Sequence, residues 1–163
     1  MTRKLMVLGG VALVALMLVG VPASAQEKPI QLALFNPVQL FPEAITIKGL
    51  RLNMIYGRNV SVTGVDLGLV NHTTTGPFLG YQWGAVGMAD SDFTGWQDCF
   101  VNVTKGTMEG FQSGLVNHAN HVSGVQLGLV NYAVTMHGLQ IGLVNIIKQG
   151  GQFPVFPIVN WSF

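Results

Sequence analysis

The chain has 163 residues, of which 49% are hydrophobic and only 9% are Asp, Glu, Lys or Arg, with a formal net charge of +1. Charges this few and this scattered offer no basic patch to nucleic acid and no electrostatic attraction to anionic lipid. Cys99 is the only cysteine, which excludes an internal disulfide, and we interpret it as a small buried residue.

The first 25 residues have the pattern of a secretory signal peptide. A basic start at residues 2–4 precedes an almost wholly apolar run at 5–21 and the small-x-small sequence Ala23-Ser24-Ala25. The run falls short of the ~20 apolar residues that a spanning helix needs, so an uncleaved anchor is the less favoured alternative. We expect residues 1–25 to be removed before Gln26, and the protein to be exported.

The remaining residues, 26–163, are enough for one compact domain, which we divide into three segments. Residues 26–48 are predicted to form an N-terminal cap, because their three prolines suit the edge of a sheet rather than a central strand. Residues 151–163 are likewise broken by prolines and are predicted to form a C-terminal cap. Such caps would cover the strand edges that otherwise promote aggregation.

The segment between the caps, 49–150, consists of seven repeats of 14–16 residues. Each begins with Gly followed by an apolar residue, most have Gln at the third position, and most have Asn at the eighth. The structural repeat positions are Gly49, Gly64, Gly80, Gly95, Gly110, Gly124 and Gly138; Gln82, Gln97, Gln112, Gln126 and Gln140; and Asn71, Asn102, Asn117, Asn131 and Asn145.

The repeat predicts an all-β fold, a short β-solenoid of about seven turns with a cap at each end. Apolar residues alternate with small or polar ones, as in a strand, and two glycines in eight residues disfavour a helix. In parallel stacked turns, identical Gln or Asn amides lie ~4.8 Å apart and bond to one another, which rewards repetition. We expect stacking to bury the apolar side of each repeat.

An eight-stranded antiparallel outer-membrane β-barrel is the alternative. Phe163 follows Trp161 and Val159 at alternate positions, as in a closing barrel strand, and seven repeats plus this strand make eight. However, the apolar stretch of each repeat covers only ~14 Å of strand against the ~25 Å of a lipid-facing band. Asp98 and Ser113 also fall within that stretch. The solenoid is therefore favoured.

The stretches FNPVQLFPEAITIKGLRLNMIYG, the serial G-x-Q-x-G-L-V-N repeats and PVFPIVNWSF resemble the bacterial surface-repeat proteins, a secreted family of uncharacterised function. The resemblance covers essentially residues 26–163. It implies an exported, surface-associated protein and brings no catalytic residues with it. The third and fourth repeats depart from the pattern, with Gly87 in place of Asn and Asp98-Cys99 in place of Leu-Gly.

Three carboxylates form the one candidate metal site. Asp90, Asp92 and Asp98 match the first, third and ninth positions of a calcium-binding loop. The twelfth position holds Val101 instead of Glu, and no helices are predicted beside it. A calcium cluster is thus the less favoured hypothesis, and a solvated acidic turn is preferred.

Consecutive repeats carry aromatic residues at the second position: Tyr81, Trp96 and Phe111. We favour packing of these rings within a wide middle section of the solenoid. An exposed strip of stacked rings that binds carbohydrate is the alternative.

The sequence contains no Ser-His-Asp set, paired-carboxylate motif or phosphate-binding loop, so we predict a non-enzymatic protein without a cofactor. The predicted function is that of an exported structural scaffold or interaction module at the cell surface, outer membrane or periplasm. A small outer-membrane barrel protein is the alternative. Expected partners are a surface protein or carbohydrate, and not nucleic acid. Association with a membrane and self-association through the solenoid ends are both compatible with the pattern.

Overall fold

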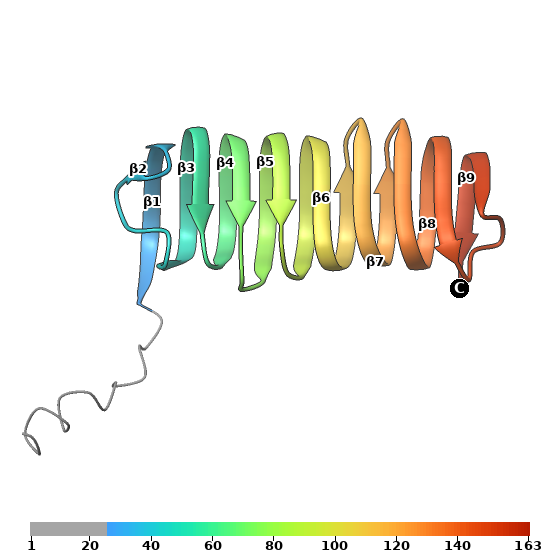
Figure 1. Cartoon of the computed structure of the whole chain (residues 1–163), viewed down its shortest axis with the longest axis horizontal. Helices are drawn as coiled ribbons and strands as arrows, with labels where there is room; N and C mark the ends of the chain where they lie inside the picture. The colour runs from blue at the N-terminus through green and yellow to red at the C-terminus, as the bar shows by residue number, and fades with distance from the viewer. Residues whose placement is uncertain (1–25) are drawn as a thin grey trace, which may run out of the picture.

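The computed structural model describes residues 26–163, which form a straight rod built from nine strands (Figure 1). The predicted signal peptide lies outside the described residues. No helix that is long and apolar enough to cross a membrane occurs in the part of the chain described. The strands are β1 (Glu27–Phe35), β2 (Val38–Gln39), β3 (Thr46–Asn59), β4 (Val62–Thr73), β5 (Phe78–Ala89), β6 (Phe93–Ser113), β7 (Val116–Leu127), β8 (Val130–Gln149) and β9 (Val155–Ser162).

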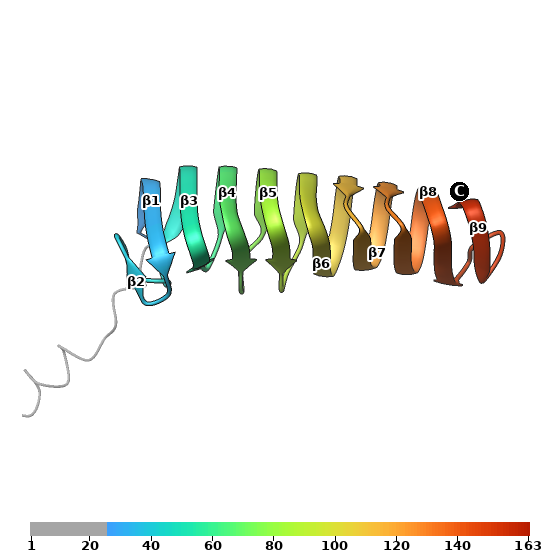
Figure 2. The same ribbon diagram turned by 90° about the horizontal axis from the view of Figure 1, so that it is seen from above.

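The strands form one sheet in the order β2-β1-β3-β4-β5-β6-β7-β8-β9. Neighbours from β3 to β8 pair in parallel, and equivalent repeat positions face each other, as in Gly64↔Gly80 and Gln126↔Gln140. The predicted β-solenoid is confirmed, and Figure 2 shows its turns following one another along a straight axis. The antiparallel barrel is wrong, because identical residues stack in register only when successive turns run in the same direction.

The first glycine of each repeat is required by the spacing between turns. These glycines have φ between 120° and 147°, a region that L side chains rarely adopt. A Cβ at Gly138 would also lie 1.9 Å from the carbonyl oxygen of Gly124 on the preceding turn. At each position of the glycine column, a side chain would therefore be directed into the backbone of the preceding turn.

The apolar core occupies a different column from the one expected. Besides Ala89, Ala119, Ala133 and Ile147, it contains the side chains two positions before each first glycine, which are almost completely inaccessible to solvent. These are Ile47, Val62, Phe78, Phe93, Met108, Val122 and Met136. Phe78 and Phe93 stack with ring centroids 4.5 Å apart. The alternating apolar residues inside the repeats instead point outward, so the expected burial of that side by stacking is wrong.

Both ends of the rod are closed by short segments that bond to the interior. β1 stacks on β3 in parallel and adds a turn before the first predicted repeat. The buried Gln31 amide of that turn donates to the Phe41 carbonyl and accepts from the Phe41 N–H, at 2.8 and 3.0 Å. At the other end β9 reverses direction against β8, and the Asn160 amide donates to the Phe153 carbonyl at 2.8 Å. Each cap thus contributes a buried amide that bonds to the backbone of the same cap.

Candidate functional site

A ladder of buried glutamines runs through the middle of the rod, as the sequence predicts. The Nε2 of each glutamine donates to the Oε1 of the glutamine one turn earlier, over 2.7–2.9 Å, from Gln140 back to Gln82. The Oε1 of Gln140, at the C-terminal end of the ladder, accepts no bond. The ladder is therefore directional, with every donor pointing towards the N-terminal end.

Asp66 is the acceptor on which this ladder ends. It is fully buried and accepts bonds from Gln82 at 2.9 Å and from Arg51 at 2.6 and 2.8 Å. A buried carboxylate is tolerated only when it is paired and hydrogen-bonded, and the fork of an arginine satisfies both needs. The two repeats that lack Gln at the third position are thus the two that terminate the glutamine ladder.

A second ladder, formed by asparagine side chains, connects successive turns along one edge of the rod. Asn102, Asn117 and Asn131 each donate to the Oδ1 of the asparagine on the next turn at 2.8 Å. The same amides donate to backbone carbonyls of the fourth repeat position on that turn, at 2.7–2.9 Å. The predicted Asn column is confirmed, and it fixes the backbone beneath the side chains of that edge.

The break in the asparagine ladder at Gly87 is filled by Cys99. A Cβ at Gly87 would lie 2.8 Å from the Cys99 Sγ and 2.3 Å from the Gln82 Oε1, so no side chain fits there. Burial raises the pKa of the Cys99 thiol well above its usual range, with a smaller contribution from Asp66 and Asp98. The prediction of a small buried residue is confirmed, and this environment keeps the thiol in its unreactive protonated form.

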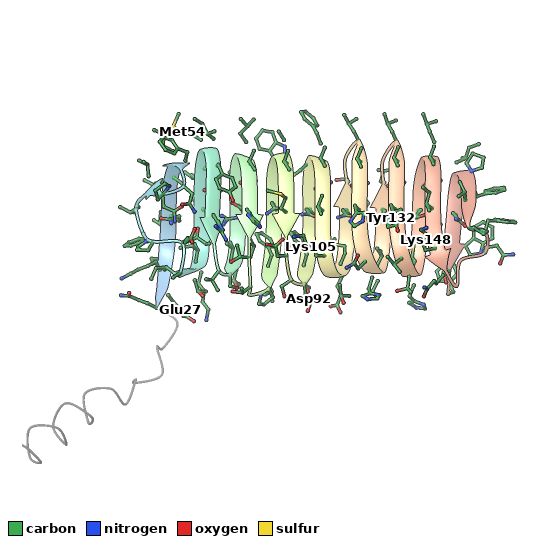
Figure 3. All side chains as sticks on the ribbon, viewed as in Figure 1. Glu27, Met54, Asp92, Lys105, Tyr132 and Lys148 are labelled. Carbon is green, nitrogen blue, oxygen red and sulfur yellow. The ribbon has the colours of Figure 1, made fainter. Side chains whose placement is uncertain are left out.

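Above the asparagine ladder, two rows of outward-pointing side chains form what we call the apolar edge. The rows are the fourth position of each repeat (Leu52, Leu67, Trp83, Asp98, Ser113, Leu127 and Ile141) and the sixth (Met54, Leu69, Ala85, Phe100, Leu115, Leu129 and Leu143). Side chains of the sixth row other than Ala85 are 48–73% exposed. Figure 3 shows Met54 on this edge, and Glu27 and Asp92 on the opposite, polar edge.

A groove runs between the two rows of the apolar edge. Its first section, from Leu52 to Leu115, has a volume of about 720 Å³, and its second, from Ser113 to Ile158, about 480 Å³. Both sections are lined by Gly114 and Leu115, so the groove is continuous. Glycines at the fifth repeat position form the floor, where a Cβ would collide with the turn beneath; at Gly84 it would lie 2.0 Å from the Gly68 carbonyl oxygen. The groove is therefore built mainly from backbone and apolar side chains.

The three aspartates of the calcium hypothesis do not converge. Asp90 pairs with Lys105 at 2.7 Å, the Asp92 carboxylate accepts from the Thr107 N–H, and Asp98 accepts from the Ser113 hydroxyl. Within residues 26–163, no three His, Cys, Asp or Glu side chains are grouped so that they could hold a metal ion. The residues predicted for the cluster thus serve three separate contacts between turns.

The aromatic residues Tyr81, Trp96 and Phe111 lie on an outer face of the rod and not in its core. Trp96 is 45% exposed. Its ring centroid lies 5.2 Å from that of Tyr81 and 5.8 Å from that of Phe111, with interplanar angles of 62° and 51°. Packing within a wide middle section is wrong. The three rings do form a strip on this outer face, but Tyr81 and Phe111 are half-buried and the tilt of the rings gives no flat stacking platform for a sugar.

One polar network joins four side chains, each on a successive turn of the rod. The Tyr56 hydroxyl bonds to His72 Nδ1 at 2.8 Å, and His72 Nε2 bonds to Asp90 at 2.8 Å, beside Lys105. Partial burial raises the pKa of Tyr56, and the bonds from Lys105 and His72 lower the pKa of Asp90 against an opposing effect of burial. These contacts link four consecutive turns of the rod.

Comparisons of the chain with protein-family models, with curated proteins and with solved structures found no match. The apolar edge is the feature that sequence reasoning missed. Its signal was present, because the fourth and sixth positions are apolar in nearly every repeat while the third and eighth are amides. On the outside of the rod, water can satisfy any polar side chain, so no single residue type needs to recur. Inside the rod, each amide must bond to its neighbours, which explains why Gln and Asn recur.

Proposed function

We propose that this protein is an exported, non-enzymatic scaffold of the bacterial cell envelope that attaches to its partner through the apolar edge. The observation that carries the proposal is the apolar edge itself, which runs along all seven repeats and contains one charged side chain, Asp98. Soluble proteins rarely expose contiguous apolar patches larger than a few hundred Å², and larger ones mark interaction sites.

The distribution of polar groups supports a binding role rather than a catalytic one. The recurrent Gln and Asn side chains are buried and bonded to one another, so they hold the turns together and do not face a ligand. The groove is lined mainly by Leu, Met, Trp, Phe and Gly, with Asp98, Ser113 and Asn53 as its polar lining residues. Such a surface suits an apolar binding partner, and its lining contains no pair of side chains arranged for acid–base catalysis.

Envelope fractionation after expression of the full chain in a bacterial host tests this proposal. We expect the exported protein to begin at Gln26 by mass spectrometry and to remain with the envelope fraction. Leu129→Asp, on the apolar edge, should release it into the soluble exported fraction. Leu79→Asp is the matched control, because Leu79 is also an exposed strand leucine, 41% against 48%, but lies outside the apolar edge.

The control should stay with the envelope. Retention of the unprocessed protein in the cytoplasm would contradict export. Equal envelope association of the wild-type protein and Leu129→Asp would contradict the role of the apolar edge. Both variants change an exposed residue, so their circular dichroism spectra should match that of the wild-type protein.

A further inference from the structure

Resting on the proposed function, we propose that the partner of the apolar edge is a phospholipid bilayer, into which the rod inserts this edge while lying flat on the surface. The side chains of the sixth row would enter the acyl region, and acyl chains would fill the groove between the rows. The geometry of the edge, its lack of charge and the residues at its border support this assignment.

The depth of the edge fits shallow insertion. The fourth and sixth rows are two strand residues apart, or about 7 Å, and peripheral proteins bury their apolar faces about 5–10 Å into the boundary of the headgroups. The sixth row contains only Met, Leu, Ala and Phe. When that row enters the acyl region, the fourth row lies at the level of the headgroups.

The residues of the fourth row suit that level. Trp83 is 55% exposed, and tryptophan and tyrosine collect where a membrane meets water. Asp98, the one charge of the edge, accepts bonds from the Ser113 hydroxyl at 2.7 Å and from the Tyr81 hydroxyl at 3.3 Å. Burial and the neighbouring Asp98 carboxylate raise the pKa of Tyr81, so its hydroxyl keeps the proton that it donates. A bonded carboxylate at headgroup level remains near water.

The position of Asp98 argues against a second copy of this chain as the partner. Asp98 lies on the fourth of seven repeats, at the middle of the edge. When two rods overlap fully along their edges, parallel or antiparallel, the two fourth repeats meet and place two carboxylates together in an apolar interface, which is strongly unfavourable. A bilayer brings no second carboxylate, and the straight edge in Figures 1 and 2 matches a flat surface.

The inference is tested by flotation of the exported form of the protein, recovered from the host, with phosphatidylcholine vesicles. We expect the wild-type protein to float with these uncharged vesicles equally well at low salt and at about 0.5 M salt, because apolar burial is not screened. Leu129→Asp should weaken binding about tenfold or more, since a carboxylate would be carried into the acyl region. Leu79→Asp should bind within about twofold of the wild-type protein.

Tryptophan fluorescence and light scattering complete the test. A blue shift on adding vesicles that is absent in Leu129→Asp and lost in Trp83→Phe would place Trp83, rather than Trp96 or Trp161, at the membrane. Failure to float, binding that requires anionic lipid and disappears in high salt, or equal loss in Leu79→Asp would overturn the inference. A dimer that Leu129→Asp dissociates, without vesicle binding, would assign the edge to a second copy. Edge-dependent envelope retention with no vesicle binding would preserve the proposed function and reject lipid as the partner.

Discussion

At the scale of single residues, the exceptions to the repeat are as informative as the repeat. A ladder of amides that all donate in one direction needs an acceptor at its end, and Asp66 fills that place without bringing a donor of its own. Its charge then requires a buried cation, which Arg51 supplies on the adjacent turn. The third position therefore departs from Gln twice in succession for one electrostatic reason.

Asp66→Gln should destabilise the protein by about 3–5 kcal/mol, because it leaves the Arg51 guanidinium buried without a counter-charge. The double variant Arg51→Gln, Asp66→Gln removes both charges and extends the ladder of neutral amides, so we expect it to recover at least half of that loss. Urea unfolding followed by circular dichroism measures both free energies. A double variant no more stable than Asp66→Gln would show that the ion pair is not what makes Asp66 necessary.

At the scale of the strands, β5 and β6 show how two departures from the repeat compensate. Gly87 removes the asparagine that elsewhere bonds beneath the apolar edge, and Cys99 replaces the glycine that elsewhere forms the floor of the groove. The thiol occupies the space left by the missing amide. Close packing makes the residues at these two positions dependent on each other.

The double variant Gly87→Asn, Cys99→Gly should lose less free energy of unfolding than the sum of the losses in the two single variants. Gly87→Asn alone places a Cβ against the Cys99 Sγ, and Cys99→Gly alone leaves a void, each costing about 1–3 kcal/mol. Together they restore the Asn and Gly of the other repeats. The Gln82 amide must turn away from residue 87 in both Gly87→Asn and the double variant, so that cost cancels in a double-mutant cycle. The relief of the contact with the sulfur should then appear as a favourable coupling of about 1 kcal/mol or more. Additive effects would mean that the two sites do not share one space.

At the scale of the whole molecule, the caps decide where a repetitive structure stops. Each turn offers its backbone and its amides to the next, so an uncapped end would accept another copy of the chain. β9 prevents this by pairing antiparallel to β8 and by carrying Pro157, which has no N–H to donate. Gln31 and Asn160 close the polar interior on the backbone of Phe41 and Phe153.

Removal of residues 151–163 should convert the protein from a monomer into concentration-dependent oligomers, because β8 then exposes an unpaired edge. Asn160→Ala is the milder control. It keeps β9 in place and should remain monomeric, while losing about 1–2 kcal/mol through the hydrogen bonds to Phe153. Size-exclusion chromatography with light scattering measures the molar mass of the truncated protein and of Asn160→Ala at several concentrations. A truncated protein that stays monomeric would show that β9 is not needed to prevent self-association through the ends.

The periodicity of the sequence by itself determined the all-β fold and the length of one turn, 14–16 residues. The recurrence of Gly, Gln and Asn favoured parallel stacking in register over the antiparallel barrel, and the structure confirms it. These features are local and repeated, so they follow from spacing and hydrogen-bonding chemistry without knowledge of the closed structure.

Only the tertiary structure decided which side of each repeat faces inward. Alternation with a period of two assigns side chains to opposite sides of a strand but does not say which side is buried. Closing the turn settles this, because it places the amides of Gln97 and Asn102 where protein groups alone can satisfy them and leaves Trp83 and Phe100 outside. The compensation between Gly87 and Cys99 depends in the same way on contacts between turns. The apolar edge arises because the amides of each repeat occupy the inward-facing positions, so the apolar side chains at alternate positions of the same strand face outward.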